Sequence, residues 1–112
     1  MQFEKVEDLK LWERADQFWV SVAKILERPC IRQRRKLYEQ LSDAADSILS
    51  NIAEGFEQPT DRAFAKYLYT AKGSTAEVVT RLKLCCREAT FQKKSTPRTM
   101  PSVKRLHALR TD

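Results

Sequence analysis

Few side chains in this sequence have the chemistry of a catalyst. His107 is the single histidine among 112 residues, so the commonest general base is nearly absent. Ser47 has no base to activate it as a nucleophile. No glycine-rich phosphate loop or other cofactor motif occurs. We therefore expect no enzymatic activity and no cofactor.

The cysteines predict neither disulfides nor a metal site. Cys30, Cys85 and Cys86 are odd in number, two are adjacent, and no C-x-x-C spacing occurs. Reduced, largely buried thiols in the cytosol are the expectation. A zinc site would have to combine these thiols with His107 at an unfamiliar spacing, so we predict that no metal is bound.

Net charge is concentrated at the C-terminal end. Through Phe91 the chain has 15 Lys and Arg against 14 Asp and Glu, whereas the remainder has six cations and only Asp112 as an acid. Such a segment commonly meets an anionic surface, of which nucleic acid is the first candidate and membrane headgroups the second. A merely solubilising tail is the remaining alternative. The six cations are Lys93, Lys94, Arg98, Lys104, Arg105 and Arg110.

A second basic cluster precedes the middle of the chain. Five cations within nine residues, with no acid among them, could neutralise several phosphates. No aromatic residue is interleaved, so we expect binding through backbone charge with little sequence specificity. The alternative is a solvated loop that neutralises nearby helix carbonyls and carboxylates. The cluster consists of Arg28, Arg32, Arg34, Arg35 and Lys36.

The clearest structural pattern predicts a long helix over residues 60–90. Its apolar residues follow a heptad repeat without an interrupting proline. Thr60 or Asp61, after Pro59, is the expected N-cap. The repeat consists of Phe64, Leu68, Ala71, Thr75, Val78, Leu82, Cys85 and Ala89.

Two further helices are predicted upstream. Residues 34–54 share the helical period, and Gly55 occupies the position where a left-handed C′ residue would end the helix. Residues 5–27 form the first predicted helix, which Pro29 ends.

Length and composition bound the architecture. A chain of 112 residues with 42% apolar and 32% charged residues is expected to be one soluble globular domain. We predict an all-α, up-and-down antiparallel four-helix bundle with a short or degenerate fourth helix. Residues 1–91 form its body, and residues 92–112 a basic linker and short C-terminal helix. No stretch approaches the roughly 18 apolar residues that span a bilayer, so we expect a cytoplasmic protein without a membrane partner.

Three blocks of the sequence resemble one bacterial family. These are Phe3 through Ala15, the S-I-L-S-N-I-A-E-G-F run of residues 47–56, and Phe64 through Glu77. The sequence is similar to small four-helix-bundle proteins encoded in intervening sequences of 23S rRNA genes, or serving as accessory variability proteins of diversity-generating retroelements. The resemblance covers about residues 3–90. It implies a ring-shaped homopentamer without enzymatic activity, whose basic surface associates with nucleic acid or a reverse transcriptase.

The residues of this signature suit structural roles. Ser47, Asn51 and Glu54 share one flank of a helix and could form an interhelical hydrogen-bond cluster, with a catalytic or ligand-binding role as the alternative. A mid-helix Gly73 costs about 1 kcal/mol relative to alanine, so either a neighbouring helix approaches closely there or the surface tolerates it. The full set is Ser47, Asn51, Glu54, Gly55, Gly73, Ser74 and Glu77.

Together these features favour a non-catalytic homo-oligomer, most simply a pentamer, that binds RNA or DNA electrostatically. The alternative is an interaction scaffold that docks a partner enzyme such as a retroelement reverse transcriptase.

Overall fold

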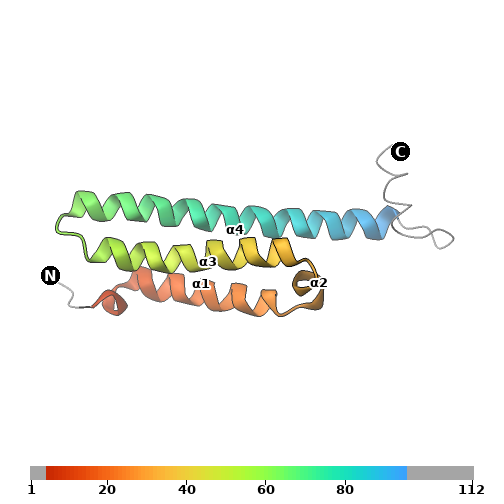
Figure 1. Cartoon of the computed structure of the whole chain (residues 1–112), viewed down its shortest axis with the longest axis horizontal. Helices are drawn as coiled ribbons and strands as arrows, with labels where there is room; N and C mark the ends of the chain where they lie inside the picture. The colour runs from red at the N-terminus through yellow and green to blue at the C-terminus, as the bar shows by residue number, and fades with distance from the viewer. Residues whose placement is uncertain (1–4, 96–112) are drawn as a thin grey trace. The chain divides into compact units, whose positions relative to one another are not determined.

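The protein is helical throughout the part that a computed structural model describes, residues 5–95, with side chains described for residues 5–88. No strand occurs within those residues. Figure 1 shows the long helices. The elements in chain order are the 3-10 turn η1 (Val6–Asp8), α1 (Lys10–Leu26), α2 (Pro29–Arg32), α3 (Arg35–Phe56) and α4 (Asp61–Ser95).

Contacts divide the chain into two compact units, Met1–Val79 and Thr80–Asp112. The first unit holds α1, α2, α3 and the N-terminal half of α4. Its most completely buried large side chains are Val22 from α1, Leu41 and Ile52 from α3, and Val78 from α4. In the second unit the last described part of α4 has half-buried Leu82 and an exposed Leu84.

Helix α1 begins later than the sequence predicts. Leu9 has an extended backbone, with φ −79° and ψ 134°, so the chain makes the 3-10 turn η1 first and α1 starts at Lys10. Ala15, Val22 and Leu26 form the buried stripe of α1. These residues recur at helical spacing, which is why the sequence revealed the helix but not its first residue.

Pro29 begins a helix as well as following one. It occupies the first turn of the one-turn α2, where its missing N–H costs nothing because that group would have no intrahelical partner. Ile31 anchors α2 and is only 3% exposed. A single turn is too short to show a helical period, so no pattern in the sequence predicts α2.

The prediction that Gly55 is a left-handed C′ residue is wrong. Neither glycine has a positive φ, and α3 continues through Gly55 to Phe56. Gly55 is buried because α4 approaches it closely: a Cβ there would lie 2.7 Å from Cδ1 of Phe64 and 2.7 Å from Cβ of Tyr67. Phe56 packs edge-to-face on Phe64, with ring centroids 6.4 Å apart. The glycine therefore provides space between helices and not backbone freedom.

Helix α4 has the N-cap that the sequence predicts. The hydroxyl oxygen of Thr60 accepts a hydrogen bond from the Ala63 N–H at 3.1 Å. Ala71 and Val78 of the heptad stripe are buried. The helix runs to Ser95, into residues expected to form a linker. At 1.5 Å per residue α4 is about 50 Å long.

None of the described helices has a stretch both long and apolar enough to cross a membrane.

Candidate nucleic-acid interface and signature cluster

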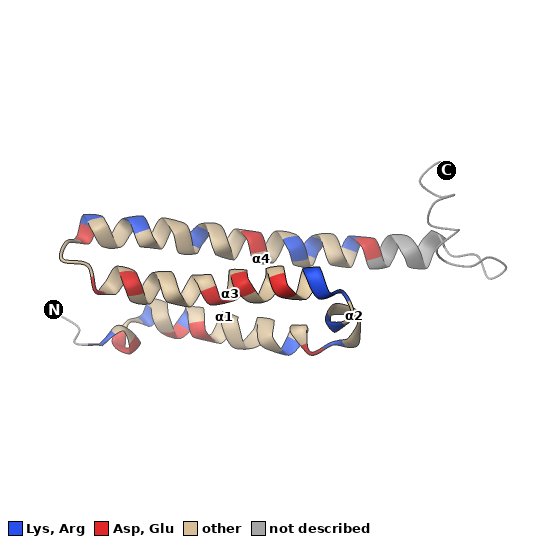
Figure 2. Ribbon diagram, viewed as in Figure 1, with Lys and Arg blue, Asp and Glu red and all other residues tan. Residues whose placement is uncertain are grey.

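The basic cluster of residues 28–36 surrounds the short helix α2. Arg28 precedes α2, Arg32 ends it, and Arg34 precedes α3. All five side chains of the cluster are exposed. Figure 2 shows Lys and Arg on both sides of α2. The turn of α2 thus displays the cations along a short stretch of surface, anchored from beneath by Ile31.

Nearby carboxylates compensate only part of this charge. Arg32 pairs with Glu27 at 3.3 Å, and Arg35 pairs with Glu39 at 3.5 Å. The four side chains are 60–90% exposed, so each pair contributes about 0–1 kcal/mol and can open to an incoming phosphate. Among residues 5–88, Arg28 and Lys36 form no ion pair.

The other predicted anion-binding cations are not placed by the structure. Lys93 and Lys94 belong to the last turns of α4, but their side chains lie outside the described residues. Arg98, Lys104, Arg105 and Arg110 lie wholly outside them. Their part in binding stays a prediction from the sequence.

Helix α4 has further cations beyond those that the sequence predicts to bind anions. Between Asp61 and Glu88 the helix has six cations and three acids. Figure 2 shows Lys and Arg distributed along α4. A charge count restricted to the faces outside the heptad stripe would have found them. The cations are Arg62, Lys66, Lys72, Arg81, Lys83 and Arg87, of which all but the half-buried Arg81 are exposed.

Three signature residues form a hydrogen-bond cluster between α3 and α4. The side-chain amide of Asn51 donates to the backbone oxygen of Ser47 at 2.8 Å and to Ser47 Oγ at 2.9 Å. The Ser74 hydroxyl from α4 donates to Ser47 Oγ at 2.9 Å. Since a backbone carbonyl only accepts, it fixes which end of the Asn51 amide faces Ser47. The half-buried cluster thereby ties residues 27 positions apart in the chain and sets the register of the two helices.

The remaining signature residues lie outside this cluster. The Glu54 side chain is exposed, and no described residue accepts or donates a hydrogen bond to it. Glu77 and Gly73 are exposed on α4. A Cβ on Gly73 would meet no described residue within 4 Å. The predicted trio of Ser47, Asn51 and Glu54 is therefore replaced by Ser47, Asn51 and Ser74.

A contact that the sequence did not reveal joins α1 to α3. The indole N–H of Trp19 donates to an Asp46 carboxylate oxygen at 2.8 Å. A charge-assisted hydrogen bond of this kind orients the indole while its ring covers apolar neighbours.

The cysteines are more exposed than expected. Cys30 and Cys86 are exposed, and Cys85 is half-buried. Cys30 faces outward because its neighbour Ile31 occupies the buried side of α2. The described residues contain no group of three His, Cys, Asp or Glu side chains that could hold a metal ion.

We expect the replacement of Ser47 by alanine to lower the free energy of unfolding by about 1 kcal/mol, because the Ser74 hydroxyl loses its acceptor. A Ser47→Ala, Ser74→Ala double variant should lose less than the sum of the single variants, since they remove the same bond. Urea unfolding followed by circular dichroism measures both. Ser21→Ala is the control, because its hydroxyl bonds only within α1. If the losses in free energy of unfolding of the two single variants add up to that of the double variant, the hydrogen bond between Ser74 and Ser47 contributes nothing to stability.

Comparison with known proteins identifies a family. The model of the family described as 23S rRNA-intervening sequence protein matches residues 7–111. No curated protein and no solved structure matches the chain.

Proposed function

The chain belongs to the 23S rRNA-intervening sequence protein family, and on this premise we propose that it is a non-catalytic, homo-oligomeric protein that binds RNA or DNA electrostatically. The observation that supports this best is the basic cluster around α2, where five cations are exposed and two of them have no ion pair within residues 5–88. Phosphates would take the place of the carboxylates that pair weakly with Arg32 and Arg35. Neutralising these phosphates would release the counterions of the nucleic acid. We expect this to occur in the cytoplasm.

We further propose that the helices form an up-and-down antiparallel bundle. Two contacts support this arrangement: Trp19 with Asp46 between α1 and α3, and Ser47 with Ser74 between α3 and α4. The links between long helices are short, as such a topology requires.

A homopentamer is the proposed assembly. Two features of the first unit support association with further copies. The exposed Gly73 leaves open space at the surface of α4, where another helix could approach closely. Exposed Tyr69, 73% accessible, lies one turn before it on the same helix.

Salt dependence tests the proposed binding. We expect affinity for a single-stranded RNA of arbitrary sequence to fall steeply between 50 and 300 mM salt. A variant in which Arg32, Arg34 and Arg35 are all replaced by alanine should reduce the slope of log affinity against log salt by about two to three. Fluorescence anisotropy across the salt series measures the slope.

The matched control removes three other exposed cations, Lys5, Lys10 and Lys24, from outside the basic cluster. This control should retain most of the wild-type slope of log affinity against log salt. The slope depends on the cations that contact phosphates and not on the total charge of the protein. Equal affinity of the wild-type protein at 50 and 300 mM salt would refute electrostatic binding. Equal loss in the two triple variants would refute the assignment to α2.

A further inference from the structure

A pocket lined by side chains with polar groups lies between α3 and α4 in the first unit. Its volume is about 270 Å³. One wall comes from Asn51 of α3, and the other from Lys66, Tyr67 and Thr70 of α4. Ligand sites in proteins usually enclose roughly 300–1,000 Å³, so this pocket has room for one small ligand and not for a peptide helix.

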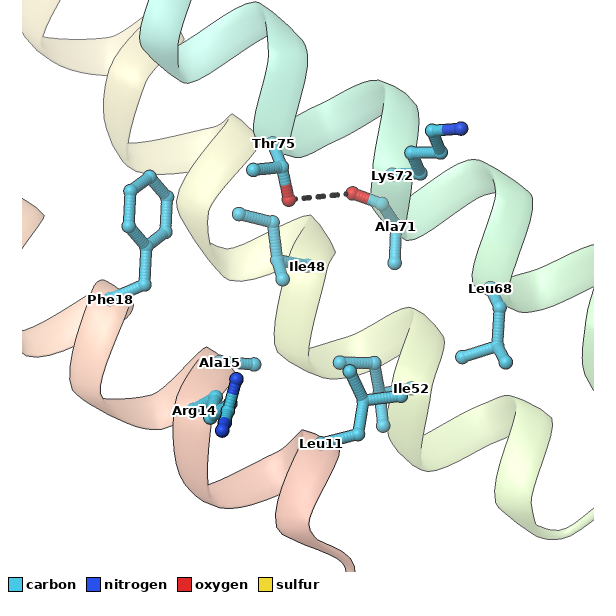
Figure 3. Close-up of a pocket in the computed structure, with 10 residues that line it drawn as sticks. All are labelled: Leu11, Arg14, Ala15, Phe18, Ile48, Ile52, Leu68, Ala71, Lys72 and Thr75. Carbon is cyan, nitrogen blue, oxygen red and sulfur yellow. Dashed lines mark hydrogen bonds between the residues drawn. The ribbon is translucent and has the colours of Figure 1, made fainter.

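The pocket lies on one flank of α4, and an apolar groove lies on the other. Residues two positions apart on a helix point in nearly opposite directions, so Thr70 is turned away from Leu68 and Lys72. Figure 3 shows Leu68 and Lys72 around the groove that α4 forms with α1 and α3. An up-and-down bundle places its fourth helix in such a groove. The pocket of Asn51 and Thr70 is therefore separate from the space of that helix.

Contacts within and between the two helices hold the lining residues in place. The side-chain amide of Asn51 donates to the backbone oxygen of Ser47 at 2.8 Å and to Ser47 Oγ at 2.9 Å, which uses both of its N–H groups. The Cβ of Tyr67 lies so close to Gly55 that no further carbon fits between them, so the approach of α3 fixes where the tyrosine side chain begins. Walls held in this way lose little conformational entropy when a ligand binds.

Three groups of the lining are left for a ligand. No residue within 5–88 donates a hydrogen bond to the Asn51 side-chain oxygen. The Lys66 side chain is exposed and forms no ion pair within the same residues. The Tyr67 ring is half-buried. The pocket thus offers a hydrogen-bond acceptor, a cation and an aromatic ring side by side.

A nucleotide has the three parts that complement these groups. Its phosphate pairs with an ammonium, its base stacks on an aromatic ring, and the N–H groups of its base donate to an amide oxygen. We propose that the pocket holds one nucleotide of a bound RNA, with the phosphate at Lys66 and the base against Tyr67. This inference rests on the proposed nucleic-acid binding and adds to it a contact that does not depend on charge alone.

The test compares a labelled oligoadenosine RNA octamer with an abasic ribose-phosphate octamer of the same charge, each binding to the full chain. Fluorescence anisotropy at 150 mM salt measures both affinities. We expect the RNA to bind about tenfold more tightly than the abasic chain, because only the RNA can stack a base on the tyrosine. Tyr67→Leu should bring the ratio of the two affinities close to one, and Tyr67→Phe should preserve it. Lys66→Gln should weaken both octamers alike, since both have the phosphate.

Tyr69→Leu is the matched control, because it removes an exposed aromatic ring of the same helix from outside the pocket and should leave the ratio unchanged. Circular dichroism verifies that each variant is folded. If Tyr67→Leu does not fold, Thr70→Leu fills the pocket from an exposed position and should lower the ratio in its place.

The outcomes separate this pocket from the proposed electrostatic binding. Equal affinity of the wild-type protein for the two octamers would overturn the pocket and leave electrostatic binding intact, whereas binding of neither would refute both. An equal fall of the ratio in Tyr67→Leu and Tyr69→Leu would also overturn the pocket. Adenosine monophosphate should displace the RNA only at millimolar concentration. Displacement at micromolar concentration would instead assign the pocket to a free nucleotide.

Discussion

Leucine in place of Gly55 should lower the free energy of unfolding by about 3 kcal/mol. Even a single Cβ at this position would lie 2.7 Å from Cδ1 of Phe64 and 2.7 Å from Cβ of Tyr67. The phenyl ring can turn aside, but the Tyr67 Cβ is attached directly to the backbone and moves only if α4 moves. Overpacking of this severity costs about 1–3 kcal/mol or more, which outweighs the roughly 1 kcal/mol that a helix gains when glycine is replaced.

Urea unfolding followed by circular dichroism measures the effect. Gly55→Ala should be destabilised in the same direction by a smaller amount, because it adds only the Cβ. Ser50→Ala in the same helix is the control, since Ser50 is exposed and its hydroxyl bonds only to the Ser47 backbone oxygen. An unfolding midpoint for Gly55→Leu equal to that of the wild type would show that α3 and α4 do not approach as described.

Leucine in place of Gly73 should dissociate the assembly without harming the fold of the single chain. Among the described residues of the chain, nothing lies within 4 Å of the added Cβ. Replacing glycine in an exposed helix should therefore stabilise the isolated chain by about 0.5–1 kcal/mol. If a helix of another copy packs on this glycine, the same side chain blocks it, and the mass falls from that of the proposed pentamer toward the monomer.

Size-exclusion chromatography with light scattering separates these states. Gln17→Leu adds the same side chain at an exposed position of α1 and should leave the mass unchanged. A monodisperse monomer of the wild-type protein at tens of micromolar would contradict the proposed oligomer. If the Gly73→Leu variant has the wild-type oligomeric mass, the oligomer would still stand, but Gly73 would not lie at its interface.

The two glycines illustrate the limit of prediction from sequence. Glycine is required either where φ is positive or where a Cβ has no room, and the residue type does not distinguish these causes. The position of Gly55 near a predicted helix end indicates the first cause, whereas in the structure Gly55 has the second. The nearby aromatic Phe64 and Tyr67 were visible in the sequence, but nothing local indicates that they face Gly55 across the α3–α4 link.

The sequence by itself determined the all-helical class, the buried stripes of α3 and α4, and the Thr60 N-cap. These features depend on residues within one or two turns of each other, so the helical period and the cap residues can be recognised in the sequence. Only the tertiary structure decided that Ser74, and not Glu54, joins Ser47, and that Asn51 and Lys66 line one pocket between α3 and α4. Both depend on the register between helices, and that register is set by packing among residues far apart in the sequence.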